Sequence, residues 1–188
     1  MKLIAMFCGS QSGKDEIYAV HAKHTARLLV EAGYGIVYGG GNTGIMGMVA
    51  NAALEAGGFV KGVIPTALQE MERCHSGLSE LMVVEDMHAR KKLMYESCAA
   101  AIILPGGFGT MDELFEMLTW NQLAIHDKPI FLLNSGGFYS DLFQMMQVMN
   151  RQGFLYGEPV EDIHIVSLPS LLLDRLVEIV PVGAADGV

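Results

Sequence analysis

The residues with the clearest capacity for chemistry lie in one segment, which reads Pro105-Gly106-Gly107-Phe108-Gly109-Thr110-Met111-Asp112-Glu113. An apolar run precedes this segment and an amphipathic run follows it, which predicts a strand, a glycine loop and a helix. Glycines let backbone N–H groups approach an oxyanion closely, and the first turn of a helix adds unpaired donors and partial positive charge. We expect Thr110 to cap the helix and to offer its hydroxyl to a phosphate. Because Glu113 adds a carboxylate one turn later, the segment predicts chemistry beside the phosphate and not binding alone.

A second glycine-rich segment reads Gly39-Gly40-Gly41-Asn42-Thr43-Gly44-Ile45-Met46-Gly47. It contains the Gly-x-Gly-x-x-Gly spacing of a dinucleotide fingerprint, but no acidic residue ends the next apolar run, 59–64, to hold a ribose. Three interpretations stay open: a nicotinamide site, tight packing of a loop on a helix, and the shaping of a nucleotide pocket. The third is favoured, and it would use Gly41, Thr43 and Gly44.

A basic segment, Met87-His88-Ala89-Arg90-Lys91-Lys92, opens the helix that precedes the Pro105 loop. Consecutive cations fan around a helix, so one or two of them can face the same cleft while the others form a solvated face. An arginine fork suits bidentate contact with phosphate or carboxylate. Arg90 is therefore predicted to lie across the substrate from Glu113.

Other chemical readings are weaker. His21 and His24 are expected at the surface and lack a third ligand, and the three cysteines, Cys8, Cys74 and Cys98, have no paired spacing, so no metal site is predicted. No Gly-x-Ser-x-Gly elbow and no Gly-x-x-x-x-Gly-Lys-Ser/Thr loop occurs, which disfavours an α/β-hydrolase and a P-loop NTPase.

Alternating strand and helix patterns must position these segments. Strands are predicted at Leu3–Cys8, Gly35–Tyr38, Phe59–Ile64, Leu81–Val84, Ala100–Leu104, Ile130–Leu133 and Ile163–Val166. Helices are predicted at Asp15–Ala32, Ile45–Ala56, Ala89–Cys98, Met111–Ile125, Phe138–Arg151 and Ser170–Val180, with a short helix plus loop in Thr66–Ser79. The pattern predicts an α/β fold, Rossmann-like and doubly wound, with a mainly parallel sheet and helices on both faces. Every glycine cluster, including Gly9 and Ser10 after the first strand, falls at a strand's carboxyl end, so the loops are expected to share one cleft.

The chain has 188 residues, 51% of them hydrophobic, and a formal net charge of −9. This length predicts one nucleotide-binding domain over residues 1–180 and a C-terminal tail over 181–188. The negative charge disfavours a nucleic acid polymer as partner, because a phosphate backbone requires a basic surface. No apolar run is long enough to span a bilayer, so we expect a cytoplasmic protein that does not bind membranes.

Taken together, these motifs resemble the Lonely Guy (LOG) family of cytokinin riboside 5′-monophosphate phosphoribohydrolases. The family's Pro-Gly-Gly-x-Gly-Thr-x-x-Glu signature is met from Pro105 to Glu113, and its Met-His-x-Arg-Lys segment from Met87 to Lys91. The Gly39–Gly47 segment is similar to the family's second glycine motif, with Ile45 in place of leucine. Asp112 stands where many members have glutamate, which is a conservative departure.

The resemblance implies hydrolysis of the N-glycosidic bond of adenosine 5′-monophosphates, with or without an N6 substituent, without a cofactor and in a homodimer. It implies catalytic roles for Glu113 and Arg90. The residues expected to bind substrate are Gly106, Gly107, Gly109, Thr110, Lys91, Met87, Gly41, Thr43, Gly44, Gly9 and Ser10. A noncatalytic nucleotide or molybdenum-cofactor carrier is the alternative, because carriers have a similar glycine signature, and a redox enzyme or decarboxylase is a third class. The "lysine decarboxylase" label of such families finds no support, since no lysine stands in a recognisable pyridoxal-phosphate context.

Overall fold

The computed structural model describes residues 1–69, 73–155 and 163–182 of the chain. The strands are β1 (Leu3–Phe7), β2 (Gly35–Tyr38), β3 (Val60–Pro65), β4 (Glu80–Val84), β5 (Ala100–Ile103), β6 (Ile130–Leu133) and β7 (Ile163–Val166). The α-helices are α1 (Glu16–Glu31), α2 (Gly44–Glu55), α3 (Met87–Ser97), α4 (Phe108–Gln122), α5 (Ser140–Arg151) and α6 (Pro169–Ile179). Short 3₁₀ helices lie at η1 (Thr66–Leu68) and η2 (Ser135–Gly137).

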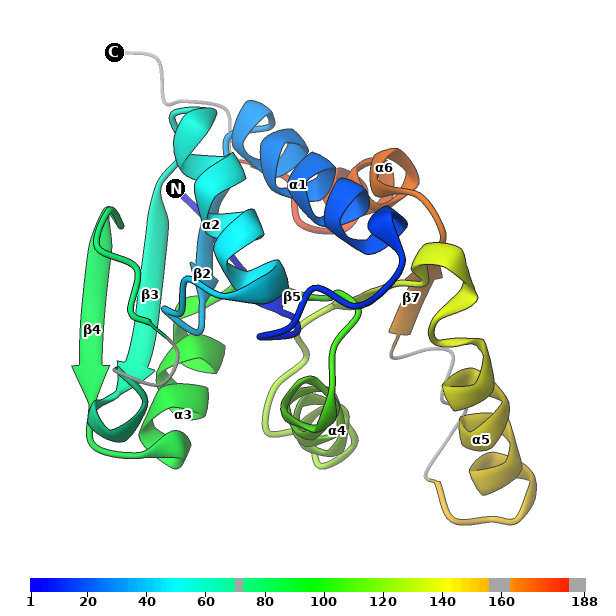
Figure 1. The fold of residues 1–188 in the computed structure, drawn as a ribbon. Coiled ribbons are helices and arrows are strands. Elements are labelled where there is room, and N and C mark those ends of the chain that lie inside the picture. Colours follow the sequence, from blue (N-terminus) through cyan, green and yellow to red (C-terminus); the bar gives the residue numbers. More distant parts are fainter. Residues whose placement is uncertain (70–72, 156–162, 183–188) are drawn as a thin grey trace.

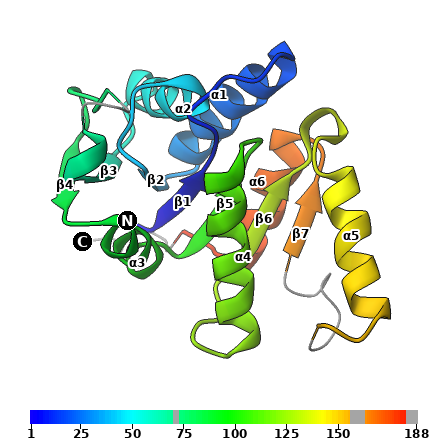
Figure 2. The ribbon, with the colours of Figure 1, turned by 60° about the horizontal axis from the view of Figure 1, so that its bottom comes forward.

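The strands of the described residues form one seven-stranded sheet in the order β4-β3-β2-β1-β5-β6-β7, and every neighbouring pair is parallel. The chain moves outward from β1 to β4 and then returns to the other side of β1 with β5 (Figures 1 and 2). This reversal between β1 and β5 marks the crevice at the carboxyl ends of the strands where such folds bind ligands. The predicted Rossmann-like, doubly wound α/β fold is confirmed.

The two faces of the sheet are covered by different helices. In one face, β1 contributes Ile4 and Met6 to a core with α1, α2 and α6; in the other, it contributes Ala5 and Phe7 to a core with α3, α4 and α5. Figures 1 and 2 show these helix layers on either side of the strands. The alternation follows from the period of two along a strand, and it explains why strands buried on both sides are continuously apolar.

Strand and helix positions agree with the sequence-based prediction, apart from boundary shifts of a few residues. The short helix predicted in Thr66–Ser79 is present as η1, and residues 70–72 of that segment lie outside the described residues. Residues 183–188 of the predicted tail lie outside them too.

The predicted surface position of one histidine was wrong. His21, expected at the surface, is buried, and its Nδ1 lies 2.9 Å from the hydroxyl of buried Ser135, so this polar pair joins α1 to η2. The pattern misled because a histidine with a buried hydrogen-bond partner has the same sequence signal as an exposed one.

Candidate active site

The Pro105 loop leads directly into α4, whose first residue is Phe108 and whose N-cap is Gly107. Because glycine has no side chain, it cannot satisfy the free N–H groups of the first helical turn. The prediction that Thr110 caps this helix was wrong: Thr110 is the third helical residue and is buried, and a side chain at Gly106 would collide with its hydroxyl. Gly109 has low helix propensity, and this hid the first turn in the sequence. The loop therefore ends in an open helix N-terminus, which is an anion-binding geometry.

A cavity of about 220 Å³ lies over this helix end and is called the carboxyl-edge cleft. Its walls are the segments Cys8–Ser10 and Gly107–Thr110 together with the side chains of Met46, Leu68, Met87, Arg90 and Glu113. The structure thus brings together predicted site residues from the loop after β1, the start of α3 and the start of α4. Cys8, Met46, Leu68 and Phe108 also line the cleft, and sequence reasoning did not assign them a role. Their proximity to strand ends was the available signal.

Arg90 is held rigidly although it faces a cavity. Asp86 caps α3, with its Oδ1 accepting from the N–H of Ala89 at 2.8 Å, and this sets Arg90 in the first helical turn. The side chain is only 4% exposed, and its Nη2 donates to the carbonyl of Gly39 at 2.9 Å. A Cβ on Gly39 would occupy the place of that Nη2 atom. The absence of a side chain at Gly39 therefore leaves the space that the Arg90 guanidinium occupies.

Glu113 lies in the second turn of α4, half-buried, with its carboxylate on the wall of the same cleft. Two phenols lie behind it. Tyr139 donates to the carbonyl of Leu104 at 2.6 Å, and burial, then the charges of Cys8 and Glu113, raise its pKa. The hydroxyl of Tyr95 donates to Glu116 Oε2 at 2.8 Å and also lies 3.3 Å from the backbone carbonyl of Glu113. Both phenols stay protonated near neutral pH, so they position this part of the site as neutral donors.

Lys91, expected to bind substrate, is engaged elsewhere. Its Nζ lies 3.0 Å from Asp112 Oδ2 and 2.9 Å from Glu116 Oε2. Burial acts to lower its pKa, but the hydrogen bonds and charges of Glu116 and Asp112 outweigh burial, so the pKa is raised. The lysine is not among the residues that line the cleft, and its contacts tie α3 to α4.

The second glycine segment contributes to the cleft indirectly. Gly41, Thr43 and Gly44 are not on the walls, whereas Met46 is. Gly44 has a φ of 56°, and a side chain there would collide with the backbone of Ser10. The N–H of Met46 donates to the carbonyl of Gly9 at 3.3 Å. The segment thus packs α2 against the loop after β1, which is the second of the three interpretations, and it reaches the cleft wall through Met46.

The described residues hold no group of three or more His, Cys, Asp or Glu side chains that could bind a metal ion. Over the same residues, no helix has the length and apolar character needed to cross a membrane.

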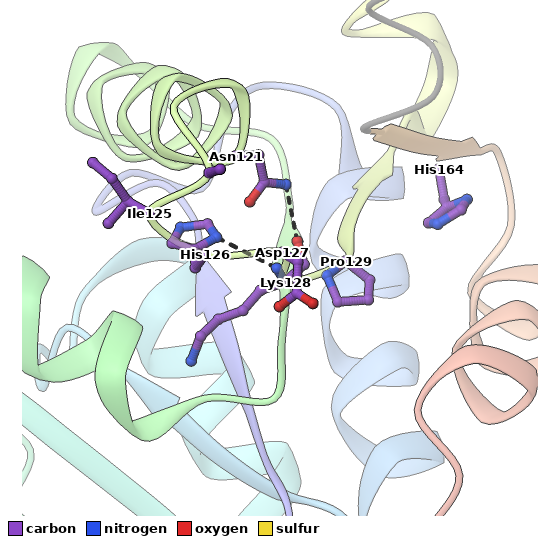
Figure 3. A pocket seen from close by; sticks show the side chains of 8 residues that line it. Asn121, Ile125, His126, Asp127, Lys128, Pro129 and His164 are labelled. Atoms are coloured by element: carbon purple, nitrogen blue, oxygen red, sulfur yellow. Dashed lines mark hydrogen bonds between the residues drawn. The ribbon is translucent and has the colours of Figure 1, made fainter.

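A larger cavity, about 610 Å³, opens at the edge of the sheet where strands begin, and is called the amino-edge cavity (Figure 3). Its walls include Asn121, His126, Lys128 and His164. The side chains of Asn121 and His126 bond the backbone of Lys128, at 3.1 and 3.4 Å, and the Nζ of Lys128 donates to the carbonyls of Tyr95 and Cys98 at the end of α3. These bonds fix the chain between α4 and β6 and cap α3, whereas Asn121 Oδ1 and His126 Nε2 are buried without a hydrogen-bond partner among the described residues.

The chain is similar to known proteins in both sequence and structure. The family described as "Possible lysine decarboxylase" matches residues 46–176. A cytokinin riboside 5′-monophosphate phosphoribohydrolase from Arabidopsis thaliana is 42% identical over 100% of the chain and 81% of its own length. One from Rhodococcoides fascians is 44% identical over 82% of the chain and 78% of its own length.

Among solved structures, the molybdenum cofactor binding protein of Rippkaea orientalis superposes with a TM-score of 0.73, covering 95% of this chain and 97% of the other, at 21% identity. The molybdenum cofactor carrier protein of Chlamydomonas reinhardtii gives 0.72 over 95% and 97%, at 18% identity. At such low identity the likeness establishes the fold alone.

Proposed function

We propose that this chain, which belongs to the family of the cytokinin riboside 5′-monophosphate phosphoribohydrolases, hydrolyses the N-glycosidic bond of adenosine 5′-monophosphates and releases the free base and ribose 5-phosphate. The observation that carries this is the meeting, in one cleft, of an open helix N-terminus, a buried arginine and a carboxylate. The first suits a phosphate, and the other two suit the bond to be cleaved.

The 5′-phosphate binds at the start of α4. Its oxygens accept from the backbone N–H groups of the first turn, around Gly107 and Gly109, where the helix dipole adds partial positive charge. Gly9 and Ser10 form the opposite wall. Thr110 is buried but lines the cleft, and its hydroxyl lies close to Gly106, where a side chain would collide with it.

With the phosphate at that end, the anomeric carbon lies toward Glu113. Breaking the C1′–N bond leaves the electron pair on the base and positive charge on the ribosyl ring, and water oxygen then bonds to C1′. A carboxylate at this place stabilises the ring cation or takes the proton of the attacking water, as in glycoside hydrolysis. Arg90 orients Glu113 and the sugar, and its bond to Gly39 keeps it in place without substrate.

Decarboxylase chemistry is not favoured in this cleft. A pyridoxal phosphate enzyme needs a lysine amine to form a Schiff base. Among the described residues that line the cleft there is an arginine and a glutamate but no lysine, and the ammonium of Lys91 is bound to two carboxylates.

The deciding experiment is chromatography of purified protein incubated with AMP, N6-isopentenyl-AMP and the two matching nucleosides. Free base from the monophosphates alone is the expected result, because the phosphate supplies the binding energy that positions the sugar. Comparable turnover of adenosine and AMP would contradict the proposal, and tight AMP binding without base release would favour a carrier. The rate ratio of the two monophosphates gives the base preference.

We further propose a homodimer that buries the outer surface beside α3. Edge strand β4 exposes three successive apolar side chains, Leu81, Met82 and Val83, and Met87 at the start of α3 is 40% exposed. Such a strand is open to association unless it is covered. Light scattering on a size-exclusion column should give twice the chain mass, falling to one chain mass in Val83→Asp. A monomeric wild-type protein would contradict this. Location in the cytoplasm stays a prediction from sequence.

A further inference from the structure

A second cavity, of about 210 Å³, lies at the carboxyl edge on the opposite side of the glycine loops and is called the aromatic pocket. It is formed by the segments Gly9–Gly13 and Pro105–Gly107 with the side chains of Tyr18, Ile45 and Phe138. It shares Gly9, Ser10 and Gly107 with the carboxyl-edge cleft, so the two cavities meet at the same loops. Together they straddle the crevice between β1 and β5.

Two aromatic rings shape this pocket. Tyr18 and Phe138 lie edge to face, with ring centroids 5.6 Å apart, and 42% of Phe138 is exposed. Gly13, whose φ is 73°, packs closely against the Tyr18 ring, since a Cβ there would come within 2.7 Å of it. Underneath, the buried contact between His21 and Ser135 holds α1 to η2, and Phe138 follows η2 directly. A partly exposed ring on a rigid apolar wall is a surface on which a planar group can stack.

The chemistry of the walls selects the ligand. None of the described residues that line the aromatic pocket is charged, and its aromatic and aliphatic side chains favour a planar uncharged group. The anion site at the start of α4 lies at the shared wall, through Gly107. That single helix N-terminus matches one phosphate with a ring on either side.

We propose that the chain binds nucleoside 5′-phosphodiesters across both cavities, with one nucleoside in the carboxyl-edge cleft and a second planar ring, joined through the same phosphate, in the aromatic pocket. This rests on the phosphate position of the proposed function. The aromatic pocket then discriminates among ligands by what the phosphate carries, while Arg90 and Glu113 act on the nucleoside in the cleft.

The test compares two ligands of equal charge by isothermal titration calorimetry. One is the dinucleoside monophosphate ApA, in which one phosphate joins two adenosines, and the other is the methyl ester of AMP, which has the same diester and no second ring. Stacking predicts that ApA binds about tenfold more tightly than the ester. Equal affinities would overturn the proposal.

Matched variants locate the second ring. Phe138→Ala should remove the preference for ApA over the ester, and Phe138→Tyr, which keeps the ring, should retain it. Phe154→Ala removes a phenyl ring that is 80% exposed at another place and should retain the preference too. A preference that survives Phe138→Ala would overturn the proposal even if the wild-type protein shows it. Loss of the preference in Phe154→Ala would also overturn it.

The binding test is independent of the proposed function, because calorimetry measures affinity and needs no turnover. Release of adenine from AMP with equal affinities for ApA and the ester would leave the phosphoribohydrolase standing and remove the aromatic pocket as a binding site. A clear preference for ApA without adenine release from AMP would do the reverse.

Discussion

The helix ends at the two edges of the sheet differ in whether their backbone polar groups are bonded. At the carboxyl edge, α4 begins behind Gly107 with its first N–H groups open toward a cavity. At the amino edge, the last turn of α3 is closed, because the ammonium of Lys128 bonds the carbonyls of Tyr95 and Cys98. The larger cavity is at the amino edge. Our proposal for the chemical site therefore rests on open backbone donors next to held ionisable groups, and not on cavity volume.

The same contrast separates activity from stability. Substitutions in the carboxyl-edge cleft are expected to lower turnover and leave the stability of the fold unchanged. Substitutions of Lys128 and its neighbours are expected to lower stability and leave turnover unchanged. Four measurements can break or sharpen this contrast, from the largest expected effect to the smallest.

Glu113→Gln should lower kcat for AMP by about 10²–10⁴-fold, because the amide neither stabilises a ribosyl cation nor accepts a proton from water. Thermal unfolding should be close to that of the wild type. The control is Asp112→Asn, its sequence neighbour, which pairs with Lys91 and is absent from the cleft walls. Near-normal turnover in Glu113→Gln would remove Glu113 from the mechanism.

Gly39→Ala should lower kcat by up to about 100-fold, because the new methyl group displaces the Arg90 guanidinium and misplaced catalytic groups lose rate steeply. The fold should persist, since the displaced atoms are the end of a flexible side chain. A double-mutant cycle supplies the control: adding Gly39→Ala to Arg90→Ala should have little further effect on kcat. Additive losses would mean that Gly39 acts independently of Arg90.

Lys128→Met should lower the free energy of unfolding by about 2 kcal/mol, as expected for hydrogen bonds from a charged donor, and kcat should be unchanged. Urea unfolding measures the first and AMP hydrolysis the second. Lys92→Met is the matched control on α3, because its pair with Glu96 is exposed and 3.8 Å long, and it should change stability by less than about 0.5 kcal/mol. A loss of turnover in Lys128→Met would break the contrast between the edges.

Acidification should destabilise the amino edge slightly. Burial, then the charge of Lys128, lowers the pKa of His126, and burial, then the charge of Arg175, lowers that of His164. Both histidines have a lower pKa in the folded protein than the value near 6.5 of the unfolded chain. The stability that the neutral histidines contribute is therefore fully present above pH 6.5, and it is lost as the pH falls through their folded-state pKa values.

The unfolding free energy should therefore fall from pH 7 to pH 5, and His126→Gln should reduce that fall by less than about 1 kcal/mol. Exposed His24, replaced in the same way, is the control. An unchanged pH dependence in His126→Gln would assign the effect to other groups.

The sequence predicts the fold well, because alternating apolar runs and glycine loops are local signals that a parallel sheet preserves. It also predicts that Arg90 and Glu113 share a cleft, since both follow strand ends. What it could not show depends on contacts between distant segments. Lys91 and Arg90 are neighbours with similar charge, yet only Arg90 reaches the cleft, because the other side chain meets Asp112 and Glu116 on α4.

Helix starts in glycine-rich segments were also beyond local reasoning. Propensity placed the beginning of α4 at Met111, whereas the helix begins at Phe108. The error matters because it moves Thr110 from the cap to the third residue of the helix, where it is buried and lines the cleft.

The reversal of strand order at β1 has a consequence for synthesis of the chain. Ile4 pairs with Ala100, so one side of the central strand stays open while β2, β3 and β4 emerge from the ribosome and assemble on the other. The nascent chain then carries an apolar edge strand, a known starting point for aggregation, until β5 arrives to cover it. Because Gly9 and Pro105 are then joined by a backbone hydrogen bond of 3.1 Å, the step that closes this edge also brings together the two halves of the cleft. The pairing of β5 with β1 thus also assembles the cleft, and β6 and β7 extend the sheet beyond it.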